Sequence, residues 1–250
     1  MKYNILNGDA LAYSFPESEI EGAIIVCREA LIDGDVSGND LPSFWQARAK
    51  YLGVAENDYH DKVVSQFEQV LQAPDGSTFN LWFEYDLFCQ VNMWFVLSLL
   101  HGLSIRKKVY AVYTSYVDRD SKHFWNGYGP ATSPQLQVCY ADRILLSDVD
   151  GQLGHDLWAA YKDNNLDALS RLASHPTDAF PYLQEVVQAH IDRFPHDGTA
   201  GRPESVIADI LQQGTTDFPG VFQEFWKRES IYGFGDTQLK SIYDMVMRGQ

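Results

Sequence analysis

The sequence has few cysteines and no long uninterrupted apolar segment. Its three cysteines, Cys27, Cys89 and Cys139, form no C-x-x-C pair of the kind that zinc ribbons and redox motifs use. Cys27 and Cys89 lie in apolar runs, as buried free thiols do, which predicts a reducing compartment. The most apolar stretch, 87–100, is too short and too interrupted to span a bilayer, and residues 1–30 do not resemble a signal peptide. We therefore expect a cytoplasmic protein without a membrane partner.

Basic residues are also scarce. The chain has 19 Lys and Arg against 34 Asp and Glu, a formal net charge of −15. Because non-specific affinity for nucleic acid depends on Lys and Arg neutralising phosphates, a nucleic-acid partner is not expected. What the chain has in quantity is aromatic side chains, at 14% of 250 residues. These aromatic side chains suffice to build a core. If some of them lie in a subunit interface instead, the chain would form a homo-oligomer.

The standard phosphate and metal motifs are missing. There is no G-x-x-x-x-G-K-[ST], no G-x-G-x-x-G after the first predicted strand and no H-E-x-x-H. The segment 34–38 has its serine one place away from a G-x-S-x-G elbow, and no strand leads into it. A P-loop enzyme, a standard dinucleotide-binding fold and a zincin are thereby excluded.

The N-terminal half alternates between two patterns. Short apolar runs typical of strands lie at 3–6, 23–27, 79–85 and 109–114. Apolar residues at helical spacing lie at 44–52, 58–71 and 87–101. This alternation predicts an α/β domain over 1–125, with a mostly parallel, Rossmann-like sheet and helices on both faces.

The C-terminal half reads differently. A linker region is predicted at 126–145, beginning with a loop rich in Gly and Pro at 126–134, and an all-helical domain at 146–250. No convincing strand is predicted after that loop. The helices of this domain are predicted at 148–162, 166–173, 182–194, 203–213, 219–228 and 237–248.

Charged residues follow three of the predicted strands. Because the carboxyl ends of parallel strands meet at one edge of the sheet, where ligands bind, these residues are expected to converge. The candidate catalytic residues are Asp9, Glu29, Glu84 and Asp86, and the candidate ligand-binding residues are Asn7, Gly8, Arg28, Arg48 and Gln90. Carboxylates in such a group hold Mg²⁺ for a phosphate substrate, or one of them acts as a general base. Arg28 would bind a small anionic group.

Simpler explanations exist for several of these residues. Asp9 and Asp86 each precede a predicted helix, where Asp is a preferred N-cap. Arg28 and Glu29 pair with each other in the simplest arrangement. Glu84 is harder to explain, because an unpaired carboxylate at the end of an apolar strand is costly. Its partner would be Arg28, Arg48 or a ligand.

The same residues resemble a known family. The motifs are Asn-Gly-Asp-Ala at 7–10, Cys-Arg-Glu-Ala-Leu at 27–31 and Trp-Phe-Glu-Tyr-Asp-Leu-Phe-Cys-Gln at 82–90. They resemble the bacterial family known as domain of unknown function 1835. The C-terminal half, through Arg-Phe-Pro at 193–195 and Tyr-Gly-Phe-Gly-Asp-Thr at 232–237, resembles the helical domain that often follows it. The resemblance implies that the two halves form a unit, and it implies no substrate or mechanism.

Three functions are compatible with these observations. The first is binding of, or action on, a small phosphorylated or nucleotide-like ligand at the strand ends, with Mg²⁺ as a candidate cofactor. The second is a non-catalytic regulatory or protein-interaction module that uses the C-terminal helices, for which a winged-helix-like arrangement is one option. The third is a scaffold in which the carboxylates serve as caps and surface pairs.

Overall fold

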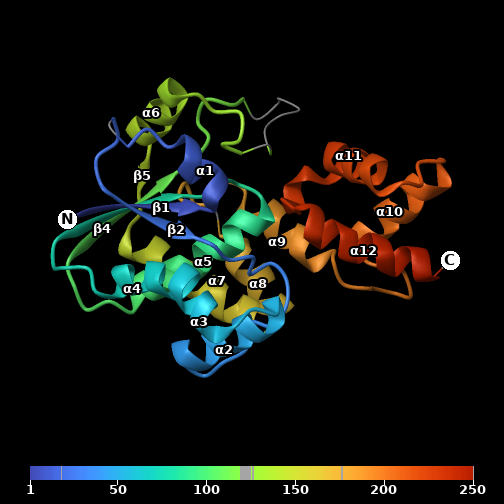
Figure 1. The fold of residues 1–250 in the computed structure, drawn as a ribbon, viewed down its shortest axis with the longest axis horizontal. Coiled ribbons are helices and arrows are strands. Elements are labelled where there is room, and N and C mark those ends of the chain that lie inside the picture. Colours follow the sequence, from blue (N-terminus) through green and yellow to red (C-terminus); the bar gives the residue numbers. More distant parts are fainter. Residues whose placement is uncertain (18, 119–124, 126, 176, 250) are drawn as a thin grey trace.

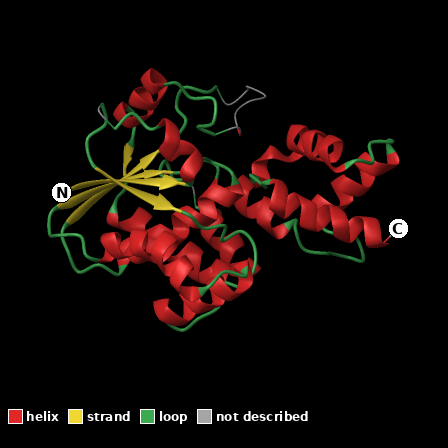
Figure 2. Ribbon diagram, in the orientation of Figure 1, coloured by secondary structure: helices red, strands yellow, loops and turns green. Residues whose placement is uncertain are grey.

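A five-stranded sheet forms the centre of the N-terminal half (Figures 1 and 2). The computed structural model describes residues 1–17, 19–118, 125, 127–175 and 177–249. The strands are β1 (Lys2–Asn7), β2 (Ala23–Cys27), β3 (Ser77–Trp82), β4 (Lys107–Val112) and β5 (Ile144–Leu145). They lie in the order β2-β1-β3-β4-β5, in which the first four are parallel and β5 is antiparallel to β4. The predicted mostly parallel sheet, followed by helices, is confirmed.

Helices cover both faces of this sheet (Figure 1). In the first half they are α1 (Asp9–Ser14), α2 (Leu41–Leu52), α3 (Glu56–Tyr59), the π-helical turn η1 (His60–Val64), α4 (Ser65–Leu71) and α5 (Leu87–His101), followed by α6 (Ser133–Ala141). Side chains from alternate strand positions supply the two cores. Ile5 and Leu81 face the layer that contains α5, while Leu6 and Trp82 face α1 and α6.

Local side-chain chemistry explains where α2 begins. The sequence predicted a helix that begins at residue 44. The helix starts at Leu41 because Asp40 accepts a hydrogen bond from the Ser43 amide at 2.9 Å and the two residues form a reciprocal capping box. The predicted helix over 58–71 is a continuous helical segment from α3 to α4, interrupted by the wider turn of η1.

Two elements inside the predicted linker region were missed. Helix α6 and strand β5 both fall between 126 and 145, where only a linker was expected. A capping box between Thr132 and Gln135, with Pro134 in the first turn, marks the start of α6. Strand β5 has two residues and adds an antiparallel edge next to β4. The expectation that no strand follows the first half was wrong for this one element.

Helices make up the rest of the chain. They are α7 (Asp148–Lys162), α8 (Leu166–Ala173), α9 (Leu183–Ile191), α10 (Arg202–Gln212), α11 (Phe218–Glu229), the 3₁₀ turn η3 (Ser230–Tyr232) and α12 (Asp236–Gly249). Helix α7 packs along α5, and α8 and α9 continue that layer. Helices α10, α11 and α12 pack on one another to one side of the sheet (Figure 1).

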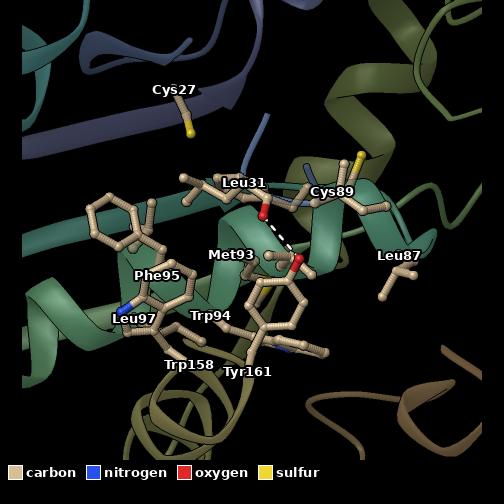
Figure 3. Close-up of a cluster of buried hydrophobic side chains, with 14 of the residues drawn as sticks. Cys27, Leu31, Leu87, Cys89, Met93, Trp94, Phe95, Leu97, Trp158 and Tyr161 are labelled. Carbon is tan, nitrogen blue, oxygen red and sulfur yellow. Dashed lines mark hydrogen bonds between the residues drawn. The ribbon is translucent and has the colours of Figure 1, made fainter. Parts of the chain in front are cut away.

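The largest core is built around α5 and crosses the predicted boundary. Most of α5 is buried, and Trp94 and Phe95 on it contact aromatic rings of α7, Tyr161 and Trp158 (Figure 3). The Tyr161 hydroxyl donates a hydrogen bond to the Leu31 carbonyl at 2.9 Å (Figure 3). Residue 126, where the predicted linker starts, lies outside the described residues, and the division at 126–145 stays a prediction. None of the helices described is both long and apolar enough to cross a membrane.

Candidate functional site

The strand order creates a switch point between β1 and β3. The chain leaves β1 toward β2 on one side and leaves β3 toward β4 on the other. In open α/β sheets ligands bind outside the carboxyl ends of the strands at such a point. Leu6 pairs with Trp82 in the sheet, so the segments that follow them, 7–9 and 83–86, leave it together. These segments contain five of the predicted site residues.

Glu84 is the acid nearest the end of β3. Its carboxylate accepts hydrogen bonds from the Cys89 thiol at 3.0 Å and from the Tyr128 amide at 3.2 Å. The Gln90 side chain donates to the Glu84 carbonyl at 2.7 Å. Burial raises the pKa of the Glu84 carboxyl, and the hydrogen bonds offset part of that shift. Neither Arg28 nor Arg48, the partners that the sequence suggested, pairs with it.

Asp86 has two roles in one side chain. It is the N-cap of α5, since its carboxylate accepts a hydrogen bond from the Cys89 amide at 3.0 Å. It is also buried, at 5% exposure. Burial, and next the charge of Glu84, raise the pKa of Asp86 to about 7. The simpler explanation, a cap, is therefore confirmed, and the cap is an acid that titrates near neutrality.

Cys89 connects these acids to β1. The Asn7 side chain donates to the Cys89 sulfur at 2.9 Å, and Asn92 donates to the Asn7 side-chain oxygen at 2.9 Å. Burial, then the charges of the neighbouring acids, raise the pKa of the Cys89 thiol well above its usual value. The thiol is therefore protonated at neutral pH and donates its hydrogen to Glu84.

One group of side chains here has the spacing of a metal site. Glu84, Asp86 and Cys89 each offer one ligand atom, and these atoms lie within 4.8 Å of one another. Carboxylate oxygens suit hard cations such as Mg²⁺, whereas a thiolate suits softer ions such as Zn²⁺. The described residues thus include three groups that can hold a divalent cation once they lose their protons.

Two further segments approach the acids from elsewhere in the chain. Gly127 has a φ of +65°, and a Cβ there would lie 2.6 Å from Glu84 Oε1. Gly233, with a φ of +63°, is so close to the Asp86 carboxylate that a Cβ would overlap it. The loop before α6 and the turn after η3 therefore both cover this site, and both need glycine to do so.

Asp9 and Arg28 form a separate pair on the same edge of the sheet. Their side chains meet at 2.9 Å and are 46% and 33% exposed, respectively. Arg28 also donates to the Lys62 carbonyl at 3.0 Å. Asp9 is the first residue of α1 and not its cap; the capping position is Gly8, which has a φ of +90° and open space around it.

Glu29 and Arg48 belong to the interior. The two side chains are fully buried and paired at 2.9 Å, and the Tyr59 hydroxyl donates to the other Glu29 oxygen. Arg48 donates as well to the carbonyls of Asp33 and Asp35, which holds the loop after β2 in place. All the charge of this pair is satisfied inside the protein, so its role in the structure is to fix that loop.

The structure thus brings some predicted residues together and separates others. Asn7, Glu84, Asp86 and Gln90 form one connected group, and Gly8, Asp9 and Arg28 lie on the adjoining edge. Sequence reasoning missed Cys89, Asn92 and the glycines that cover the acids. For Cys89 a signal existed, because it is three residues after Asp86 at the start of a helix, where its amide meets the cap.

No protein-family model, curated protein or solved structure matches this chain. The resemblance to domain of unknown function 1835 stays a prediction.

Proposed function

We propose that this chain binds a small phosphorylated or nucleotide-like ligand at the carboxyl ends of β1 and β3. The observation that carries the proposal is the acidic pair of Glu84 and Asp86 at the switch point. Both acids have a raised pKa, and within the described part of the chain no basic side chain pairs with either. Paired carboxyl groups with such a shift are typical of functional sites.

Buried acids without a basic partner need a proton or a cation to offset their charge. Protonated Asp86 is a hydrogen-bond donor at neutral pH and, when deprotonated, an acceptor, which suits general acid–base work. A divalent cation instead binds both carboxylates and, through its remaining positions, the phosphate of a ligand. Mg²⁺ would use Glu84 and Asp86 alone, and Zn²⁺ would recruit the Cys89 sulfur too.

The adjoining edge supplies a site for the anionic part of the ligand. Arg28 is partly exposed and bound to one carboxylate, so an incoming phosphate competes with Asp9 for its guanidinium. Gly8 leaves open space beside this pair, which lets the backbone approach a ligand closely. These features support a phosphorylated ligand more than an uncharged one.

A thermal-shift screen tests the proposal. The probes are nucleotides and sugar phosphates, each with Mg²⁺, Mn²⁺ or Zn²⁺, and the proteins are wild type, Glu84→Gln and Glu17→Gln. Glu17 is exposed, so its variant makes the same chemical change away from the acids. A ligand that binds the folded state raises the melting temperature by mass action. We expect the shift in wild type and Glu17→Gln and its loss in Glu84→Gln.

A screen without any shift in the wild type contradicts the proposal. A shift of equal size in Glu84→Gln contradicts its location. The first result would favour the alternative function, a module whose C-terminal helices contact another protein, and partner capture would then replace ligand screens.

We further propose the reducing, cytoplasmic location and the small anionic ligand that the sequence predicts. Three buried free cysteines fit a reducing cytoplasm. The charge of −15 opposes nucleic acid as the ligand, so a nucleotide is expected and a polynucleotide is not. Light scattering would establish whether the chain is a homo-oligomer.

A further inference from the structure

A cavity lies between the two halves of the chain, apart from the acidic pair. Its volume is about 420 Å³. It is lined by Ile32 in the loop after β2, Tyr161 in α7, His190 in α9, Glu204 in α10 and Ile242 in α12. The cavity therefore forms where the cluster of α10, α11 and α12 meets the rest of the molecule.

His190 in the wall of this cavity has unused hydrogen-bonding capacity. The residue is 3% exposed, and neither ring nitrogen has a hydrogen-bond partner. Its ring lies 4.8 Å from that of Tyr161 and 5.3 Å from that of Phe194. Burial, and next the charge of Arg193, lower the pKa of His190 to about 3, so the imidazole is neutral. Buried polar atoms without partners are rare in folded proteins.

Arg193 supplies an unpaired positive charge to the same cavity. Its guanidinium donates a hydrogen bond to the Ile32 carbonyl at 3.0 Å, interacts with the Tyr161 hydroxyl and lies 5.5 Å from the centre of the Phe234 ring. No carboxylate of the described residues forms an ion pair with it, although the chain is strongly acidic. A guanidinium has five N–H donors, and the free ones suit the two oxygens of a carboxylate.

Glu204 supplies the complementary group. Its Oε2 atom is buried and has no hydrogen-bond partner. Gly201 packs against both the Arg193 carbonyl and Glu204 Oε2, so the carboxylate lies close to the Arg193 backbone. A buried carboxylate oxygen of this kind needs a donor, and an ammonium group satisfies it best.

We propose that this cavity binds a small zwitterion of the α-amino acid class with a large apolar side chain. The carboxylate of the ligand binds Arg193, its ammonium group binds Glu204 and the neutral His190 ring completes the polar contacts. The apolar side chain lies against Phe194, Phe234 and Ile242, which also line the cavity. This site does not depend on the function proposed for the strand ends.

Isothermal titration calorimetry with matched probes tests the chemistry. L-phenylalanine and L-leucine carry both charges, phenylpropionate lacks the ammonium group and phenethylamine lacks the carboxylate. We expect saturable binding of the amino acids and binding weaker by about tenfold or more for each analogue, since each loses a charged hydrogen bond. Equal binding of phenylpropionate would overturn the zwitterion, and absence of binding by every probe would indicate a solvent-filled cavity and overturn the site.

Variants locate the binding. Arg193→Gln and Glu204→Gln should each weaken the binding of L-phenylalanine by about tenfold to a hundredfold. Glu17→Gln and Glu84→Gln should leave the affinity for L-phenylalanine unchanged. The Glu84→Gln result separates this site from the one at the strand ends. Unchanged affinity in both cavity variants would overturn the assignment.

A measurement on the wild type covers the case in which a variant fails to fold. The Cε1–Hε1 signal of His190 in a proton–carbon NMR spectrum, assigned with His190→Phe, should shift on titration with L-phenylalanine and saturate at the calorimetric Kd. A His190 signal that stays in place while binding saturates would contradict the location.

Discussion

At the scale of single residues, Asp86 combines a cap with a titrating acid. Asn caps a helix as well as Asp does but does not titrate, so Asp86→Asn separates the two roles. The folded state raises the pKa of Asp86 from 3.8 to about 7, so the folded protein holds this proton more tightly than the unfolded chain. Its contribution to stability is therefore complete below about pH 4 and is lost as the pH rises through about 7.

The expected result is a difference in pH dependence. Between about pH 8 and about pH 5, the free energy of unfolding of the wild type should rise relative to that of Asp86→Asn by about 1 to 3 kcal/mol. Urea unfolding at several pH values measures it. Groups away from Asp86, such as His190 with its lowered pKa, are common to both proteins and cancel in the difference, whereas the neighbouring Glu84 titrates together with Asp86 and contributes to it. Parallel curves would show that Asp86 is already ionised in the fold.

Arg48 offers a second test at this scale. Removing a partner from a buried ion pair leaves an uncompensated charge, so Arg48→Met should lower the free energy of unfolding by about 3 to 5 kcal/mol. Arg106→Met is the matched control, because Arg106 pairs with Asp75 at the surface and should change stability far less. Chemical denaturation compares the two. Similar losses would mean that the Glu29 carboxylate finds another partner or takes up a proton.

At the scale of elements, the turn after η3 carries the sharpest steric constraint. Gly233→Ala places a methyl group on the Asp86 carboxylate and also strains a φ of +63°. Gly53, which ends α2, has nearly the same φ, +66°, and no atom near a Cβ. Gly53→Ala should cost about 1 kcal/mol from backbone strain, and Gly233→Ala about 1 to 3 kcal/mol more from overpacking. Thermal and urea unfolding measure both, and equal losses would remove the contact with Asp86 from the explanation.

Which elements could be predicted depended on how local their signals are. Strand β2 and helices α5, α7 and α8 match their predicted ranges, since their apolar patterns lie within the segment itself. Strand β5 has two residues and exists because β4 lies beside it. No local pattern reports such pairing. The early start of α2 depends on one side chain, Asp40, which a search for apolar spacing passes over.

At the scale of the whole molecule, the candidate site could be predicted in part. Parallel strands alone bring Asn7 and Glu84 to one edge, and the structure agrees. The partners of the acids come from farther away: the Tyr128 amide reaches Glu84, and Gly233 covers Asp86. Such contacts depend on how the later helices pack, which residue patterns do not encode. For the same reason, the sequence predicted Glu29 at the open edge of the sheet, whereas the structure places it in the core, paired with Arg48.

The turn that follows η3 has a mechanical consequence. Gly233 contacts Asp86, and the next residue, Phe234, lines the cavity between the halves. Consecutive Cα atoms stay about 3.8 Å apart across a trans peptide, and the described chain has no cis bond. A displacement of the Gly233 backbone away from the acidic pair therefore carries the Phe234 backbone with it, so we expect a ligand that moves this turn to alter the cavity wall as well.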